Sequence, residues 1–158
     1  MLTVFLIGTY LLLYVRYPIK YEREIISASK EFNVNDKLIR SVIWTESKYR
    51  AQAESSAGAV GLMQLLPSTA HFAATLCGEQ YVQSELKTPS VNIRLGVCYL
   101  AYLLNKFDER DAIAAYNAGE GNVRKWIGDG KEEYPFKETR DYVERVYSAK
   151  RIYEYLYK

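Results

Sequence analysis

Residues 37–49 read KLIRSVIWTESKY. Ile39, Val42 and Ile43 recur at the spacing of one helical face, which predicts an amphipathic helix. At about 100° per residue, Glu46 falls on the same apolar face. Burial disfavours the charged form of a carboxyl and raises its pKa, which is the condition for a general acid near neutral pH.

The helical spacing leaves a second interpretation of Glu46 open. Its carboxylate stands near the end of the predicted helix, where it can turn to solvent or pair with Arg50 four residues later. This stretch alone does not decide whether Glu46 is a buried acid or a surface carboxylate. The other motifs of the chain are needed to decide.

Outward from this helix, the chain after residue 18 alternates helical patterns with residues that end helices. No run alternates apolar and polar residues as a half-buried strand would, so the fold class is predicted as all-α. The other expected helices run over 21–32, from Pro67, over 91–107, from Asp108 or Asp111 to about Gly119, from Gly121 or Asn122 through Trp126, and over 137–155, and the helix of Glu46 begins at Asn35 or Asp36.

Composition limits the classes of function. A chain of 158 residues with 49% apolar and 25% charged residues is long enough for one packed domain and is not a disordered chain. Its 21 basic and 19 acidic side chains give a net charge of +2, which does not favour nucleic acid as a partner. The 15 tyrosines suit either a small core or a wet groove for a sugar-like ligand.

The amino terminus has the pattern of a membrane segment. Residues 1–15 contain no Lys, Arg, Asp or Glu, and basic residues follow from Arg16 onward. We expect residues 1–17 to form an uncleaved, single-pass transmembrane helix and residues 18–158 to form the domain, although a buried core helix would have a similar sequence. The basic residues behind the apolar run would by themselves place the domain in the cytoplasm, but a long folded domain can be exported despite such charges.

The two cysteines and the one histidine give weak signals. Cys77 and Cys98 lie in apolar helical stretches and are expected to be packing residues, or to form one bridge if the domain lies outside the cytoplasm. They do not have the spacing of a zinc site, and His71 alone cannot build a histidine metal site. No metal or cofactor is therefore predicted.

Four separate motifs accompany Glu46 along the chain. They are Glu46-Ser47 with Ser55 and Gly58; Gly61-Leu62-Met63-Gln64; Ala115-Tyr116-Asn117-Ala118-Gly119; and Pro135-Phe136 with Glu138-Thr139-Arg140 and Tyr142-Val143. In order and spacing, over residues 22–155, they resemble the catalytic domain of the soluble lytic transglycosylase (SLT) family. This resemblance implies a lysozyme-like helical domain of the goose type.

The resemblance also implies roles for single residues. Glu46 matches the one catalytic acid of the family, and the hydroxyl of Tyr116 is expected to hydrogen-bond its carboxyl. Met63 and Gln64 are expected to line the groove, and Asn117 to bind an acetamido or hydroxyl group of the sugar. The complete set of expected substrate-binding residues is Ser55, Met63, Gln64, Tyr116, Asn117, Glu138 and Tyr142.

The function implied by the resemblance is peptidoglycan cleavage. Glu46 would protonate the β-1,4 oxygen between N-acetylmuramic acid and N-acetylglucosamine, and then, as a base, assist attack by the substrate's own 6-hydroxyl to form a 1,6-anhydro ring. The partners would be peptidoglycan strands and the membrane, with the domain outside the cytoplasm; other cell-envelope proteins stay an open class. The alternatives are a goose-type-like muramidase that adds water, and an inactive peptidoglycan-binding domain.

Overall fold

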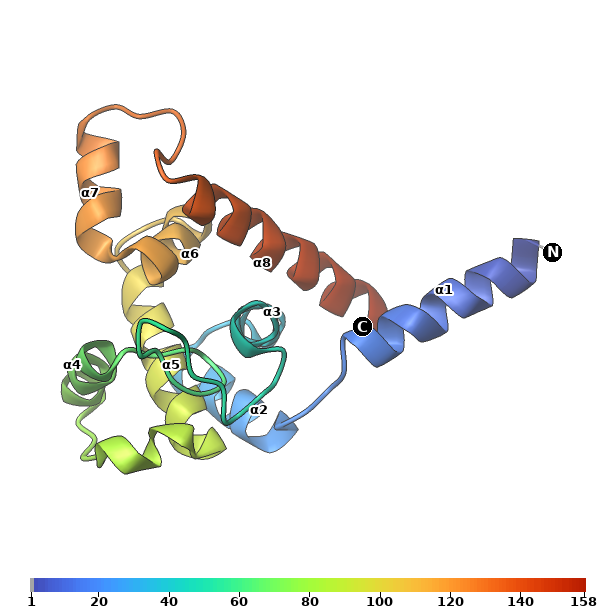
Figure 1. The fold of residues 1–158 in the computed structure, drawn as a ribbon, viewed down its shortest axis with the longest axis horizontal. Helices are drawn as coiled ribbons and strands as arrows, with labels where there is room; N and C mark the ends of the chain where they lie inside the picture. The colour runs from blue at the N-terminus through green and yellow to red at the C-terminus, as the bar shows by residue number, and fades with distance from the viewer. Residues whose placement is uncertain (1) are drawn as a thin grey trace.

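The computed structural model describes the backbone of residues 2–158, and over that range it contains helices and no β-strand, which confirms the all-α prediction. Figure 1 shows the chain from end to end. The elements are α1 (Leu2–Arg16), α2 (Glu22–Phe32), α3 (Asp36–Ser47), α4 (Pro67–Cys77), the 3-10 helix η1 (Gln83–Lys87), α5 (Pro89–Leu104), α6 (Glu109–Ala118), α7 (Glu120–Gly128) and α8 (Lys137–Leu156).

Most helix ends follow the residues that mark them in the sequence. Asn35 is the N-cap of α3, because its side-chain oxygen accepts hydrogen bonds from the backbone N–H groups of Lys37 and Leu38 at 2.8 and 3.2 Å. Proline opens both α4 and α5, at Pro67 and Pro89. The Asn35 cap fixes where α3 starts and therefore where Glu46 stands near its C-terminal end.

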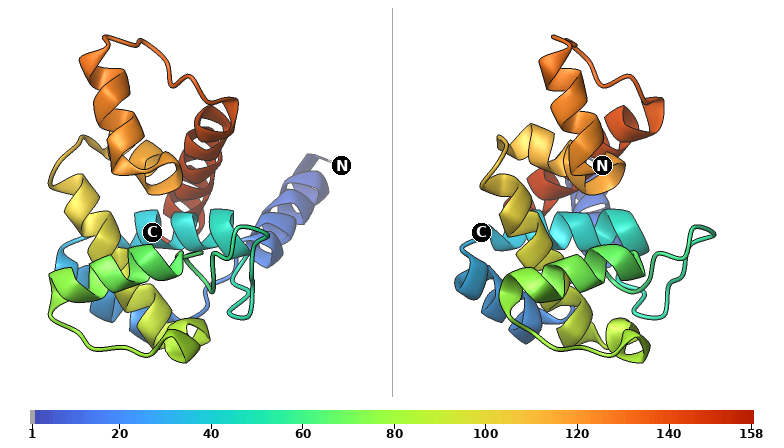
Figure 2. Two further views of the ribbon diagram at one scale, coloured as in Figure 1. Left: turned by 60° about the vertical axis from the view of Figure 1, so that its left-hand side comes forward. Right: turned by 90° about the vertical axis from the view of Figure 1, so that its left-hand side faces the viewer.

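Helix α5 is the centre of the domain. It packs against α2, α4, α6 and η1, and its buried side chains include Ile93, Leu95 and Leu100. The long helix α8 packs along α3, and in both views of Figure 2 α3 lies between α8 and α4. Helices α8 and α4 thus flank α3 on opposite sides.

The loop between α3 and α4 is fastened to α5 by Asn92, whose side chain is fully buried. Its Oδ1 accepts the N–H of Met63 at 2.7 Å, and its Nδ2 donates to the carbonyls of Val60 and Leu86 at 2.9 and 2.8 Å. Gly61 has a φ of +83°, and a Cβ there would lie 2.3 Å from Nδ2 of Asn92. Only glycine therefore fits at this crossing.

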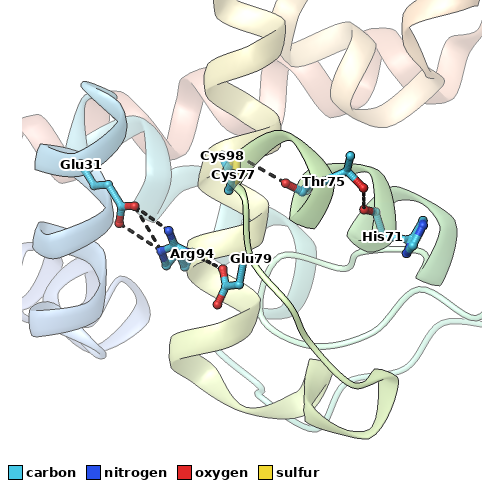
Figure 3. Close-up of a disulfide and its surroundings, with 8 residues drawn as sticks. Glu31, His71, Thr75, Cys77, Glu79, Arg94 and Cys98 are labelled. Carbon is cyan, nitrogen blue, oxygen red and sulfur yellow. Dashed lines mark hydrogen bonds and ion pairs between the residues drawn. A yellow bond between two sulfur atoms is a disulfide. The ribbon is translucent and has the colours of Figure 1, made fainter.

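A disulfide between Cys77 and Cys98 joins the end of α4 to α5, as the close-up in Figure 3 shows. The sequence left open whether the two cysteines are separate packing residues or form a bridge, and in the structure they form the bridge. Close to it, Arg94 pairs with Glu31 of α2 and with Glu79 beyond α4. One covalent and two ionic links thus tie α2, α4 and α5 together.

The chain leaves α1 through a segment that is bound tightly to the domain. Trp44 donates its indole N–H to the carbonyl of Arg16 at 3.0 Å, and Tyr157 donates its hydroxyl to the carbonyl of Tyr17 at 2.7 Å. Tyr17 is buried and stacks on Trp44 with ring centroids 4.4 Å apart. These contacts hold the end of α1 against α3 and α8.

The structure does not support the expected transmembrane helix. Helix α1 has 15 residues, about 22 Å at the usual helical rise, whereas the hydrocarbon core of a bilayer is about 30 Å thick. Over residues 2–158, no helix combines the length and the apolar character that crossing a bilayer requires.

Candidate active site

A cavity of about 260 Å³ lies where the end of α3 faces α4, α5, α6 and the start of α8. Glu46 contributes its side chain from the last turn of α3. Its lining combines polar side chains with the apolar residues Leu65, Leu66 and Tyr99. The lining residues are Glu46, Ser55, Ala57, Ala59, Gln64, Leu65, Leu66, Thr69, Tyr99, Tyr116, Asn117 and Glu138.

The carboxyl of Glu46 is withdrawn from water and takes one hydrogen bond. Tyr142 of α8 donates its hydroxyl to Oε1 of Glu46 at 2.7 Å. Burial raises the pKa of Glu46 to about 7, and it outweighs the lowering by the Tyr142 hydrogen bond and by the charges of Arg145 and Lys48. Glu46 therefore keeps a proton to near neutral pH and can donate it.

The two alternatives for Glu46 that would leave it an ordinary surface carboxylate do not match the structure. The Nε of Arg50 donates to the carbonyl of Ser47 at 3.0 Å, and no ion pair between Arg50 and Glu46 occurs in the described part of the chain. The hydrogen bond to Oε1 is also the one bond to this carboxyl among residues 2–158, which leaves Oε2 available to a substrate.

Tyr116 is bound differently from the expectation. Its hydroxyl donates to the backbone carbonyl of Met63 at 2.8 Å, so it ties α6 to the loop before α4, and Tyr142 supplies the hydrogen bond to Glu46 instead. Neighbouring Asn117 accepts a hydrogen bond at its Oδ1 from the hydroxyl of Thr139 at 3.0 Å. The motif Tyr116-Asn117 therefore joins α6 to the loop before α4 on one side and to α8 on the other.

Ser55 and Gln64 shape the loop as well as line the cavity. The hydroxyl of Ser55 accepts the N–H of Ala59 at 3.0 Å. The Nε2 of Gln64 donates to the carbonyls of Ala53 and Gly61, and the backbone of Gln64 has a φ of +48°. Both side chains are thus held in place before any ligand arrives.

Six of the eight predicted site residues line this cavity, and Met63 and Tyr142 do not. Met63 is fully buried, so the expectation that its side chain lines the groove is wrong. It packs on Gly96 of α5, where an added Cβ would lie 2.4 Å from its sulfur. Tyr142 is also buried and acts on the cavity through its hydroxyl.

Sequence reasoning missed Tyr99 as a cavity residue. Its ring contacts those of Phe72 and Tyr116 at centroid distances of 6.3 and 5.6 Å. The half-buried ring nevertheless contributes surface to the cavity. Only the three-dimensional position of α5 beneath the cavity could have shown this.

Two further groups do not join the site. Glu54, the nearest other acid along the chain, pairs with Lys87 at 3.0 Å and does not line the cavity. Within the described residues, no group of three His, Cys, Asp or Glu side chains is arranged to hold a metal ion. The second carboxyl of the cavity is Glu138, which is exposed in the first turn of α8.

Comparison with known proteins points to one class of enzyme. Residues 23–138 match the family described as transglycosylase SLT domain. The chain is 30% identical over 153 residues to the soluble lytic murein transglycosylase of Salmonella typhimurium, covering 89% of this chain and 24% of that protein. It is 35% identical over 140 residues to membrane-bound lytic murein transglycosylase C of Haemophilus influenzae, covering 81% and 39%.

A solved structure shows the same fold. The 70-kDa soluble lytic transglycosylase of Escherichia coli superimposes with a TM-score of 0.85 at 31% identity, over 90% of this chain and 25% of that one. The chain thus spans about a quarter of the length of the soluble relatives that it matches.

Proposed function

Since the chain belongs to the transglycosylase SLT domain family, we propose that residues 18–158 are a catalytic module that cleaves peptidoglycan strands as a lytic transglycosylase. The observation that carries the proposal is the carboxyl of Glu46, which stands in the cavity with a pKa raised to about 7 by burial. Relatives over this region are named lytic murein transglycosylases.

In the proposed reaction Glu46 acts first as an acid and then as a base. Its proton passes to the β-1,4 glycosidic oxygen, the bond between this oxygen and the anomeric carbon of N-acetylmuramic acid breaks, and the N-acetylglucosamine side leaves as an alcohol. The sugar's acetamido group stabilises the positive anomeric carbon. The ionised Glu46 then takes the proton of the 6-hydroxyl as its oxygen bonds to that carbon, which gives the 1,6-anhydro product.

The hydrogen bonds around Glu46 support this sequence of steps. Tyr142 binds Oε1 and leaves Oε2 for the proton that is transferred. The hydroxyl of Tyr142 also stabilises the carboxylate that forms between the two steps, because a hydrogen bond to the charged form favours it. Ser55, Gln64, Tyr116, Asn117 and Glu138 are the proposed contacts of the glycan in the cavity.

We place the reaction outside the cytoplasm. Peptidoglycan lies there, and disulfides such as Cys77–Cys98 persist in oxidising compartments. Attachment to the cell envelope through residues 1–17 stays a prediction, and the relative named as membrane-bound is in keeping with it.

Glu138 favours one rival function. Enzymes that invert the anomeric carbon use a second carboxylate as a base that activates water, and Glu138 is the other carboxyl of this cavity. In that case the chain would be a muramidase that hydrolyses the same bond.

Mass spectrometry of the muropeptides that purified sacculi release tests the proposal. A transglycosylase gives products that are lighter by one water than the products of hydrolysis. Hydrated products that disappear in Glu138→Gln would establish the muramidase instead. No release from sacculi at any enzyme concentration would leave a binding domain without catalysis.

A further inference from the structure

Helix α4 forms one side of the catalytic cavity with its first turn. Leu66, the N-cap of α4, and Thr69 in that turn both line the cavity, and we call these two residues the α4 wall. One turn further on, Phe72 packs edge-on against Tyr99 of α5 at a centroid distance of 6.3 Å, and Tyr99 lines the cavity as well. The position of α4 on α5 therefore sets three of the surfaces that a ligand in the cavity would meet.

The noncovalent packing that holds α4 in place is small. Its buried side chains are three alanines, Ala70, Ala73 and Ala74. The larger apolar side chains, Phe72 and Leu76, are 40% and 43% exposed. Alanine removes little apolar surface from water, and a helix of 11 residues is too short to be stable by itself. Helix α4 therefore depends on its attachment to α5, its main packing partner.

The bridge between Cys77 and Cys98 is the covalent part of that attachment (Figure 3). Cys77 is the last residue of α4, and Cys98 directly precedes Tyr99 on α5. The ion pair of Arg94 with Glu79, just beyond α4, is partly exposed, and such pairs stabilise weakly in water. The bridge thus joins the helix of the α4 wall to the helix that carries the third cavity surface.

We propose that Cys77 and Cys98 are positioning residues for the substrate: their bridge holds the α4 wall in place for the glycan, and reduction weakens glycan binding while proton donation by Glu46 continues. The inference rests on the proposed function. Glu46 stands on α3 and accepts its hydrogen bond from α8, so neither the acid nor its partner belongs to α4. Tight glycan binding would then require conditions that keep the bridge oxidised.

A small reductant tests the inference, because it has one target in this chain. The sequence contains two cysteines, and both are in the bridge. Dithiothreitol cleaves the S–S bond to two thiols and is itself oxidised to a cyclic disulfide. Cys77 is half-buried and Cys98 is buried, so we expect attack at the sulfur of Cys77. Titration of free thiols confirms that reduction is complete.

Binding is measured first, on protein that cannot cut. Glu46→Gln protein is titrated with soluble peptidoglycan strands before and after reduction, and we expect Kd to rise by about fivefold or more. Wild-type protein is then assayed on the same strands. KM should rise by a similar factor, kcat should change by less than about twofold, and the alkaline limb of the pH–activity profile should stay in place, because the lost interactions are those that bind the substrate.

A variant without the bridge is the matched control. Protein with both Cys77→Ala and Cys98→Ala should have the KM of reduced wild type in every buffer and should not respond to dithiothreitol. Reoxidation of reduced wild type with oxidised glutathione should restore the original KM, which keeps the test decisive even where the double variant fails to fold. Circular dichroism at the assay temperature confirms that the reduced protein is folded.

The outcomes separate the inference from the function beneath it. If reduction leaves Kd and KM unchanged, or if the double variant still responds to dithiothreitol, the inference is overturned and the proposed function stands. A fall in kcat at constant KM would mean that the bridge only keeps the protein folded, which also overturns the inference. If oxidised wild-type protein releases no muropeptides, the proposed function fails, and the Kd values of Glu46→Gln protein alone decide the inference.

Discussion

Glu46 and Glu120 each accept a hydrogen bond of 2.7 Å from a tyrosine, yet their pKa values move in opposite directions. Burial raises the pKa of Glu46 to about 7. Burial also raises the pKa of Glu120, but hydrogen bonds from Tyr102, Arg124 and Lys106 outweigh it and bring the pKa down to about 2. The tyrosine bond is common to both carboxyls; what differs is that burial dominates at Glu46, whereas Arg124 and Lys106 also bond directly to Glu120.

The largest difference in activity is expected when each carboxyl is replaced by an amide. Glu46→Gln cannot donate the proton, and turnover of sacculi should fall by a factor of about 10³ or more while the fold is kept. Glu120→Gln should retain turnover, because Glu120 has no place in the cavity. Release of muropeptides measures both, and an active Glu46→Gln protein would refute the assignment of the acid.

The second test concerns the loop between α3 and α4, which lines the cavity of Glu46 and does not contact Glu120. Asn92→Ala removes three buried hydrogen bonds to backbone groups, so the free energy of unfolding should fall by about 3 kcal/mol. Asn122→Ala is the matched control: its amide donates one exposed bond, to the carbonyl of Ala118, and the loss should be about 0.5 kcal/mol or less. Urea unfolding measures both, and equal losses would contradict the role of Asn92.

The opposite pKa shifts predict opposite effects of pH on stability. The folded-state pKa of Glu46 is raised, so its contribution is fully present below about pH 4.5 and is lost as pH rises through about 7. Glu46→Gln should therefore gain about 3 kcal/mol relative to wild type between pH 4.5 and 8.5.

Glu120 has the reverse sign. Its folded-state pKa is lowered, so its contribution is present above about pH 4.5 and is lost as pH falls through about 2. Glu120→Gln should lose stability at neutral pH and approach wild type in acid. Urea unfolding at several pH values checks both signs, and parallel pH profiles for the two variants would break the comparison.

The smallest effect is expected from the tyrosines. The hydrogen bond of Tyr142 lowers the pKa of Glu46, so Tyr142→Phe should raise this pKa and move the alkaline limb of the pH–activity profile to higher pH. Tyr102→Phe should raise the pKa of Glu120 in the same sense without moving that limb. A limb that moves to lower pH in Tyr142→Phe would mean that another group sets it.

Local rules predicted most of the helices because each helix carries its own markers. Asn35 caps α3 and Pro67 opens α4 as the sequence indicates, whereas the helical face of α3 left open whether Glu46 is buried, and the structure shows that burial raises its pKa. The 3-10 helix Gln83–Lys87 was missed, since five residues of mixed polarity carry no periodic signal.

Contacts between distant segments could not be predicted in the same way. The family resemblance implied that Tyr116 bonds the carboxyl of Glu46, but the hydroxyl that does so belongs to Tyr142, 96 residues from Glu46. The packing of α4 against α5 determines whether Cys77 and Cys98 meet. It also determines that Asn92 reaches the loop at Gly61. Periodicity specifies which face of a helix is apolar, and only packing specifies its partner.

The clamp around Arg16 and Tyr17 has a mechanical consequence. A helix joined by a flexible linker can take many directions relative to its domain. Here Trp44 and Tyr157 grip the backbone where α1 ends, and Figure 1 shows α1 running outward from that grip. The end of α1 is therefore fixed against α3, the helix that carries Glu46, and against α8.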